Sequence, residues 1–176
     1  MLAYVFWHRP AAGVDAPAYE AALAAFHTTL AANPPAGFLD SAALRTDTAP
    51  WLPGDGPAYE DWYAVEGWEA LGELNAGAVT GPRAAPHDAV AFEAGAGAGA
   101  VYRLLAGEGV SARAAAWLPK PDGEPRDAFH AALAATGGAV WMRQMVLGPA
   151  PEYVVRSDEP VRLPWEITRA ELVAVA

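Results

Sequence analysis

An internal repeat constrains the fold of this chain more than any other feature. "AFHTTLAA" at residues 25–32 is matched by "AFHAALAA" at residues 128–135. The ungapped match extends over residues 25–45 and 128–148, with identities at Ala25/Ala128, Phe26/Phe129, His27/His130, Leu30/Leu133, Ala31/Ala134, Ala32/Ala135, Ala36/Ala139 and Leu44/Leu147. Self-similarity of this kind predicts two copies of one supersecondary unit.

The residues around the repeat extend the correspondence. Trp7 and Trp117 each end an apolar run and are followed within a few residues by proline. Downstream, "YEDWYAV" and "PEYVVRS" both read as strands with an acid before an aromatic residue: Asp61-Trp62 and Glu152-Tyr153. We therefore expect the two halves to superpose, with Phe26 over Phe129 and Trp7 over Trp117.

The first half, residues 1–107, predicts the order strand, helix, strand, strand, helix, strand. Asp15 caps a first helix. The apolar positions of this helix end at Asn33-Pro34-Pro35, because proline cannot continue a helix. The stretch "AGAGAGA" predicts a flexible segment before the last strand. The other predicted elements are strands Ala3–His8, Phe38–Arg45, Asp61–Glu66 and Val101–Leu105 and helices Trp68–Asn75 and His87–Phe92.

The second half, residues 112–176, predicts the same order more tersely. Its second helix is reduced to "EPVRLPWE". The predicted elements are strands Ala114–Leu118, Ala139–Leu147, Glu152–Arg156 and Ile167–Val175 and a helix Arg126–Thr136. The order β-α-β-β-α-β is the split βαβ, ferredoxin-like arrangement, so the fold class is α+β.

Two such halves in one chain resemble the dimeric α/β-barrel superfamily in fused form. The resemblance lies in the element order and the repeat. It implies two four-stranded sheets packed face to face in one compact unit, so that the barrel closes within a monomer and any homodimer uses outer surfaces. The superfamily includes small antibiotic-biosynthesis-type monooxygenases, EthD-like proteins, stress-responsive barrel proteins and chlorite dismutase-like haem proteins.

Composition excludes several classes of function. The net charge of −10 and the lack of a basic run argue against nucleic-acid binding, because an acidic surface repels phosphates. The absence of cysteine excludes disulfides and thiolate sites. No signal peptide or membrane span is evident, so we expect a cytoplasmic protein. The Ala/Pro/Gly/Arg bias is typical of a GC-rich, bacterial genome.

His8, Tyr63 and His87 are candidate ligand-binding residues in the first half. His8 ends the first strand, where it either contacts a ligand at a cavity mouth or caps the strand. Tyr63 shares a strand face with Asp61 in "YEDWY", a pattern that suits either an aromatic ligand wall or an ordinary core. His87 begins a helix after a loop, where it either reaches over a pocket or is simply exposed.

His27 and His130 are repeated, yet neither helix offers a second ligand four residues later. A zinc site needs three or four ligands. We interpret these histidines as structural residues that tie helix to sheet, and we expect no metal and no cofactor.

Arg143 is a fourth candidate, because it lies within the apolar run "VWMRQMVLG". A charge in a buried strand is costly unless it is paired. Its counterpart in the repeat is Asp40. The pattern leaves two alternatives: an internal ion pair between Arg143 and Asp40, or an anion-binding role for Arg143.

Two functions compete at this point. One is a small-molecule binding protein or cofactor-free enzyme, most concretely an oxidase or monooxygenase of an aromatic or polyketide-like compound. The other is a non-enzymatic barrel with a structural or metabolite-binding role. An enzyme should bring His8, Tyr63 and His87 together in the first half, whereas a structural barrel should scatter them.

Overall fold

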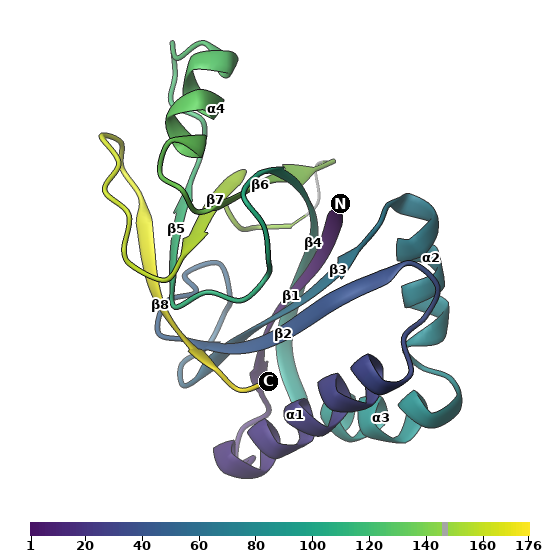
Figure 1. Cartoon of the computed structure of the whole chain (residues 1–176). Coiled ribbons are helices and arrows are strands. Elements are labelled where there is room, and N and C mark those ends of the chain that lie inside the picture. The colour runs from purple at the N-terminus through teal and green to yellow at the C-terminus, as the bar shows by residue number, and fades with distance from the viewer. Residues whose placement is uncertain (146–147) are drawn as a thin grey trace.

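Eight strands close into an antiparallel barrel with four α-helices on its outer side, in a computed structural model that describes residues 1–145 and 148–176 (Figure 1). The strands are β1 (Leu2–Pro10), β2 (Phe38–Thr46), β3 (Ala58–Val65), β4 (Ala94–Ala106), β5 (Ala114–Leu118), β6 (Ala139–Gln144), β7 (Tyr153–Ser157) and β8 (Thr168–Ala174). The helices are α1 (Ala16–Ala32), α2 (Trp68–Gly77), α3 (Ala84–Glu93) and α4 (Arg126–Ala134), with a 3₁₀ turn at Gly81–Arg83. The predicted α+β class is therefore confirmed.

The strand order around the barrel is β1-β3-β2-β8-β5-β7-β6-β4, and β4 returns to β1. Every neighbouring pair is antiparallel. The pairs β2–β8 and β4–β6 join strands from residues 1–107 to strands from residues 112–176. The barrel thus closes within one chain.

Tryptophans fill the barrel interior. Trp7, Trp62, Trp117 and Trp141 are fully buried there, and each comes from a different strand. The rings of Trp7 and Trp117 meet edge to face at 5.4 Å, the geometry that aromatic quadrupoles favour. Alanines that belong to the same interior cluster, such as Ala42 on β2 and Ala115 on β5, leave room for these rings. The alternation of small and large residues explains how an alanine-rich chain builds a filled core.

The interior also contains an ion pair that joins the two parts of the chain. Arg156 on β7 donates from Nη1 to Glu60 Oε2 on β3 at 2.7 Å, and both side chains are fully buried. The guanidinium lies 4.1 Å from the centre of the Trp62 ring. Burial lowers the pKa of the Arg156 guanidinium, and Glu60 opposes that effect. The charge is thus tolerated because it has both a carboxylate partner and an aromatic face.

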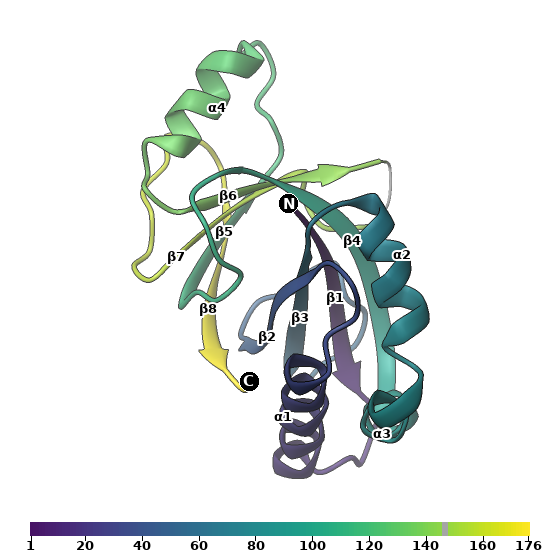
Figure 2. The same ribbon diagram turned by 45° about the vertical axis from the view of Figure 1, so that its right-hand side comes forward.

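The helices lie on the outer side of the barrel, with α1, α2 and α3 against β1–β4 and α4 on the far side (Figures 1 and 2). Asp15 caps α1 by accepting a hydrogen bond from the Ala18 backbone N–H, as predicted. The predicted α1 stripe, Tyr19, Leu23, Phe26 and Leu30, is buried. None of the helices in the described residues combines the length and hydropathy that a membrane crossing requires.

The prediction that "AGAGAGA" forms a flexible segment is wrong, because residues 94–100 form the first part of β4. Ala98 and Ala100 pack into the barrel interior. On the outer face, a Cβ at Gly97 would lie 2.5 Å from the Phe6 ring, and one at Gly99 would lie 2.7 Å from the Tyr4 hydroxyl. The glycines therefore make room for aromatic rings from β1, while the alternation with alanine matches the period of a strand.

The remaining elements agree with the sequence pattern to within a few residues, except that the predicted second helix of residues 112–176 is wrong. In the second half, the segment "EPVRLPWE" forms no helix, and its apolar side chains pack against β5–β7 instead. The end of the predicted strand 139–147, at Val146 and Leu147, lies outside the described residues.

Candidate functional site

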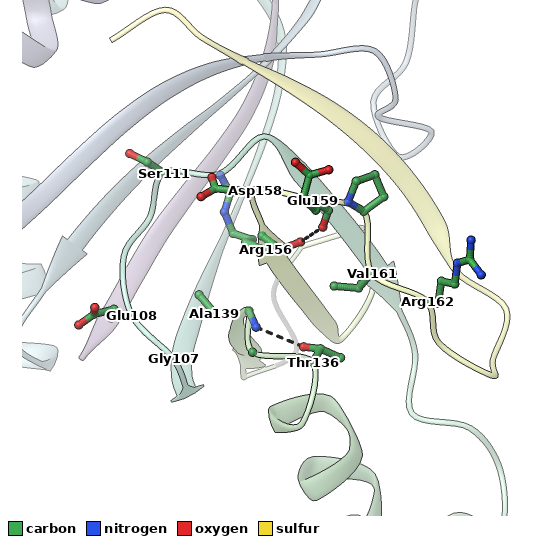
Figure 3. A pocket seen from close by; sticks show the side chains of 14 residues that line it. Gly107, Glu108, Ser111, Thr136, Ala139, Arg156, Asp158, Glu159, Val161 and Arg162 are labelled. Carbon is green, nitrogen blue, oxygen red and sulfur yellow. Dashed lines mark hydrogen bonds between the residues drawn. The ribbon is translucent and has the colours of Figure 1, made fainter.

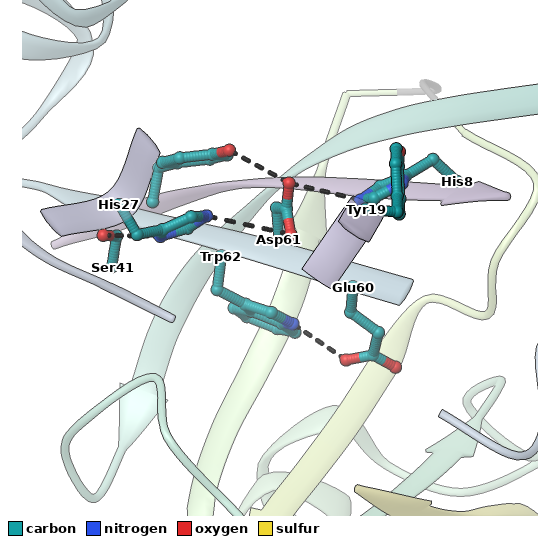
Figure 4. A network of polar contacts seen from close by, with 8 residues as sticks. His8, Tyr19, His27, Ser41, Glu60, Asp61 and Trp62 are labelled. Carbon is teal, nitrogen blue, oxygen red and sulfur yellow. Dashed lines mark hydrogen bonds and ion pairs between the residues drawn. The ribbon is translucent and has the colours of Figure 1, made fainter. Parts of the chain in front are cut away.

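The site with the most distinctive chemistry is a buried carboxylate between two histidines on the outer face of the first four strands (Figure 4). Asp61 on β3 is 3% exposed. Its Oδ2 lies 3.2 Å from His8 Nε2 on β1, and its Oδ1 lies 3.8 Å from His27 Nε2 on α1. Since Glu60 and Trp62 face the barrel interior, the alternation of β3 places Asp61 under the helices.

Hydroxyl groups hold the three members of this cluster. His8 Nδ1 is hydrogen-bonded to the Tyr19 hydroxyl at 2.7 Å, and His27 Nδ1 to Ser41 Oγ at 2.8 Å. The Tyr63 hydroxyl donates to Asp61 Oδ2 at 3.1 Å. Each imidazole is therefore fixed through Nδ1 and turns Nε2 toward the carboxylate.

The electrostatics of the cluster keep the carboxylate ionised. Burial alone would raise the pKa of Asp61, but the imidazoles of His8 and His27 outweigh it and hold that pKa well below its usual range. Burial, followed by the Asp61 charge, raises the pKa values of Tyr19 and Tyr63. The tyrosines thus remain hydroxyl donors beside a carboxylate acceptor.

Three polar atoms of the cluster have no aligned hydrogen bond within the described part of the chain: His8 Nε2, His27 Nε2 and Asp61 Oδ1. His8 Nε2 lies at ion-pair distance from Asp61 Oδ2, and His27 Nε2 from Asp61 Oδ1. Buried polar atoms are nearly always hydrogen-bonded in folded proteins. These atoms of the cluster can therefore still take up a proton or form a hydrogen bond with a small polar group.

Six rings form a stacked row along this face, which we call the ring ladder. Adjacent rings are 5.1–6.4 Å apart between centroids and within 20° of parallel. Its members, in order, are His27, Tyr63, Tyr4, Phe6, His8 and Tyr59. The ends of the ladder are buried, but Tyr4 and Phe6 are only half-buried beside the exposed Gly97. The ladder thus joins the buried carboxylate to an accessible aromatic surface.

Of the four predicted ligand-binding residues, His8 and Tyr63 meet at Asp61. His87 on α3 lies nearby, with its ring 5.6 Å from that of Phe26, which in turn lies 6.3 Å from Tyr63. Its polar contact is with the neighbouring Asp88 at 3.1 Å. His87 therefore borders the cluster through aromatic packing and takes no part in its polar network.

Arg143 lies apart from this cluster, on β6. Its Nη1 donates to the carbonyl oxygen of Gly148 at 2.8 Å and to that of Ala150. Asp40 is exposed and accepts a hydrogen bond from the Ser41 backbone N–H. The predicted ion pair between Arg143 and Asp40 is therefore wrong. Loop carbonyls compensate the guanidinium, and the internal ion pair is formed by Glu60 and Arg156.

The repeated histidines do tie helix to sheet. His27 reaches Ser41 on β2, and His130 Nε2 on α4 lies 3.1 Å from the Tyr153 hydroxyl on β7. The two histidines differ in their remaining contacts. His27 also faces the Asp61 carboxylate, so the interpretation of His27 as a residue that only ties helix to sheet is incomplete.

No group of three or more histidine, cysteine or acidic side chains among residues 1–145 and 148–176 has the arrangement of a metal site. His8 and His27 contact different oxygens of Asp61, which separates the donor atoms that a single ion would need to share.

A separate cleft lies between the loops at residues 107–111, 136–139 and 157–162 (Figure 3). Its volume is about 890 Å³, and Glu108, Asp158 and Glu159 line it. A second cleft of about 370 Å³ lies along β5 and β8. Neither cleft is lined by the residues around Asp61.

Tyr19 and Ser41 are not among the residues that the sequence pattern singles out as site residues. Tyr19 reads as one member of an apolar helix stripe, and Ser41 as a polar position in a strand. The signal that points to the cluster is an acid inside the apolar strand "YEDWYAV". An acid buried in a strand requires a partner, although the pattern does not say which.

Comparison of the chain with protein-family models, curated proteins and solved structures finds no match in any of the three. The fold and the site thus define the protein as a closed antiparallel α+β barrel with a buried histidine–carboxylate cluster under its first helices.

Proposed function

We propose that the chain is a tandem of two ferredoxin-like halves, in the manner of a fused dimeric α/β barrel. The strand order supports it: β4-β1-β3-β2 in the first half corresponds to β8-β5-β7-β6 in the second. Aligning Trp7 with Trp117 sets Glu60 against Val154, because Trp7 pairs with Glu60 and Trp117 pairs with Val154. On this alignment Asp61 corresponds to Val155, a shift of three residues from the sequence match of Asp61 with Glu152.

The same alignment makes the site specific to the first half. His8 corresponds to Leu118, since these residues pair with Tyr59 and Tyr153 respectively. Asp61 corresponds to Val155, which belongs to an apolar cluster under α4. A pair of halves that differ in this way is typical of a protein in which one half carries a site and the other supports it.

We infer that the first half binds a small aromatic or polyketide-like compound and acts on it as a cofactor-free enzyme. The convergence of His8, Asp61 and Tyr63 carries this proposal. A histidine held by a buried carboxylate is a general base, and the half-buried rings of Tyr4 and Phe6 supply an aromatic surface beside it.

An oxidase or monooxygenase is the most concrete form of this activity. The base removes an acidic proton from a CH₂ group of the substrate, and the resulting carbanion gives its electrons to dioxygen. One oxygen atom enters the product as a carbonyl group, and the other leaves as water. In such a step His8 takes the proton on Nδ1, which the Tyr19 hydroxyl must first release, and Asp61 at Nε2 stabilises the imidazolium.

Ligand-observed NMR with 1-naphthol and 2-naphthol tests the binding site. We expect binding by the wild type, weaker binding by Phe6→Ala and His8→Gln, and unchanged binding by the matched control His130→Gln in the second half. An oxygen electrode then tests turnover of hydroxylated naphthalenes and anthrones. Equal binding by all variants contradicts the location of the site.

One observation favours the alternative, a non-enzymatic barrel. His8 and Asp61 are 1% and 3% exposed, and neither described cleft reaches them. If no compound binds and the His8→Gln variant loses only stability, the cluster has a structural role.

We also propose that the folded unit is the monomer, since the barrel closes within one chain. A homodimer would use outer surfaces. Light scattering of a dilute sample tests whether the monomer stays folded.

A further inference from the structure

Ser41, His27 and Asp61 form a hydroxyl–imidazole–carboxylate series that shares Asp61 with the proposed aromatic site and adds Ser41 and His27. Ser41 Oγ lies 2.8 Å from His27 Nδ1, and His27 Nε2 lies 3.8 Å from Asp61 Oδ1. Triads of this type are recognised by geometry and roles, whatever the order of the residues along the chain. We propose that this series makes Ser41 a nucleophile toward carboxylic esters.

The orientation of His27 suits a base for Ser41. A neutral imidazole carries its proton on one nitrogen and a lone pair on the other. The tautomer with its proton on Nε2, the nitrogen on the Asp61 side, leaves the lone pair on Nδ1, next to Ser41 Oγ. The 3.8 Å separation from Asp61 is longer than a hydrogen bond, and such contacts often tighten only when substrate binds.

Ser41 is accessible, unlike the rest of the series. It is half-buried on β2, whereas His27 and Asp61 are each 3% exposed. The partial exposure of Ser41 is what gives an ester access to its hydroxyl.

The backbone at Ser41 offers a place for the developing oxyanion. The Ser41 N–H donates to Asp40 Oδ1 at 2.8 Å, so a negatively charged oxygen already occupies the position in front of this donor. Asp40 is exposed and can rotate away. An N–H group of the nucleophile itself is a common donor to the tetrahedral intermediate.

The reaction with an ester needs the three residues and water. The Ser41 hydroxyl proton passes to His27 Nδ1 as Oγ attacks the ester carbonyl carbon. The C–O bond to the alcohol breaks, and the alcohol leaves with the proton from His27. Water, deprotonated in the same way, then cleaves the acyl-serine to a carboxylic acid and restores the Ser41 hydroxyl.

The related series Tyr19–His8–Asp61 is a poorer nucleophile for a structural reason. Tyr19 is fully buried. Burial raises the pKa of its hydroxyl, and the charge of Asp61 raises it further. Tyr19 therefore stays protonated and out of reach, which leaves Ser41 as the reactive end of the cluster.

Labelling with a dialkyl fluorophosphate tests the proposal directly, because the reagent phosphorylates an activated serine and releases hydrogen fluoride. We expect intact-mass spectra of the full-length wild type to show one adduct, mapped to Ser41 by peptide sequencing. Ser41→Ala should show none. The matched control Ser157→Ala, whose hydroxyl donates to the backbone carbonyl of Glu159, should label like the wild type.

Two further variants test the mechanism. His27→Gln should slow labelling by about 100-fold, the usual contribution of a general base. Because His27 is buried and its loss can unfold the protein, Asp40→Ala provides a test at the surface. Freeing the Ser41 N–H should speed labelling by about 10-fold. Hydrolysis of p-nitrophenyl acetate should change in the same direction for each variant.

An unlabelled wild type, or an adduct that maps to another residue, overturns the proposal. An unchanged rate in Asp40→Ala overturns the oxyanion assignment. Naphthol binding by Ser41→Ala distinguishes this proposal from the proposed function, since the aromatic site does not use the Ser41 hydroxyl. Loss of labelling with binding retained supports the nucleophile alone.

Discussion

At the scale of single residues, the protein is defined by carboxylates buried on opposite faces of one strand. Asp61 faces outward to two histidines, and Glu60 faces inward to Arg156. Both carboxylates are buried almost completely. Burial of a carboxylate costs free energy, so the residues on each side of β3 must offset this cost with opposite charges or hydrogen bonds. Because the pKa of Asp61 is lowered in the folded state, the stability that this carboxylate contributes depends on pH.

Replacement of Asp61 tests this contribution. Asp61→Asn should lower the free energy of unfolding by about 3 kcal/mol at neutral pH, because it leaves the buried His8 and His27 without their carboxylate. Urea unfolding of the variant and the wild type measures the difference.

The same pair of proteins predicts a pH dependence. The pKa of Asp61 is lowered in the folded state, so the stabilisation is present above the unfolded pKa of about 4 and is lost as pH falls below it. The difference between wild type and Asp61→Asn should therefore shrink as pH falls from neutral toward about 3. A difference that stays constant over this range contradicts the assignment.

At the scale of elements, β4 shows how composition and alternation act together. Its glycines and alanines lack strong strand propensity. They form a strand because Ala98 and Ala100 fill the small spaces between tryptophans, while Gly97 and Gly99 accept rings from β1. Aromatic residues that cover glycines in a neighbouring strand are a known device for sheet stability.

A substitution at Gly97 tests this packing. Gly97→Ala should destabilise the protein by about 1–2 kcal/mol, since its Cβ would lie 2.5 Å from the Phe6 ring. In a Phe6→Ala background the same substitution should cost clearly less. Urea unfolding of the four proteins measures the cycle.

The matched control is Gly72→Ala in α2, where a Cβ meets nothing within 4 Å. This substitution should stabilise the protein by about 0.5–1 kcal/mol, because alanine is the better helix former. If Gly97→Ala costs the same with and without the Phe6 ring, the steric explanation is wrong.

At the scale of the whole molecule, the barrel is held together by contacts between its two parts. The pairs β2–β8 and β4–β6 close the sheet, and the tryptophans meet across the interior. The ion pair between Glu60 and Arg156 joins residues 96 positions apart. Because this pair lies in the interior, it requires the correct relative placement of both halves.

A double-mutant cycle tests the pair. Arg156→Met and Glu60→Leu should each lower the free energy of unfolding by about 3–5 kcal/mol, because each leaves a buried charge alone. The double variant should cost clearly less than the sum. The cycle of Arg143→Ala with Asp40→Ala serves as the control and should be additive within about 0.5 kcal/mol, since these side chains bond elsewhere. Additive costs at Glu60 and Arg156 would contradict the interior ion pair.

The sequence alone determined the order and type of most elements, because periodicity and capping are local. The Tyr19–Leu30 stripe predicts α1, and alternation places Asp61 and Tyr63 on one face of β3. The sequence also indicates that an acid within an apolar strand needs a partner. The wrong prediction at residues 94–100 also has a local cause. It gave more weight to the glycine content than to the alternation with a period of two that is typical of a strand.

Only the tertiary structure decided which residues meet. His8, His27 and Asp61 come from three elements, and their meeting depends on how α1 crosses the sheet. The partner of Arg156 depends on closure of the barrel, whereas the repeat suggested a pair between Arg143 and Asp40 that does not form. Symmetry of sequence relates positions in two halves, but contacts depend on register and packing across the interior. Those are set by the free energy of the whole core, which no local pattern encodes.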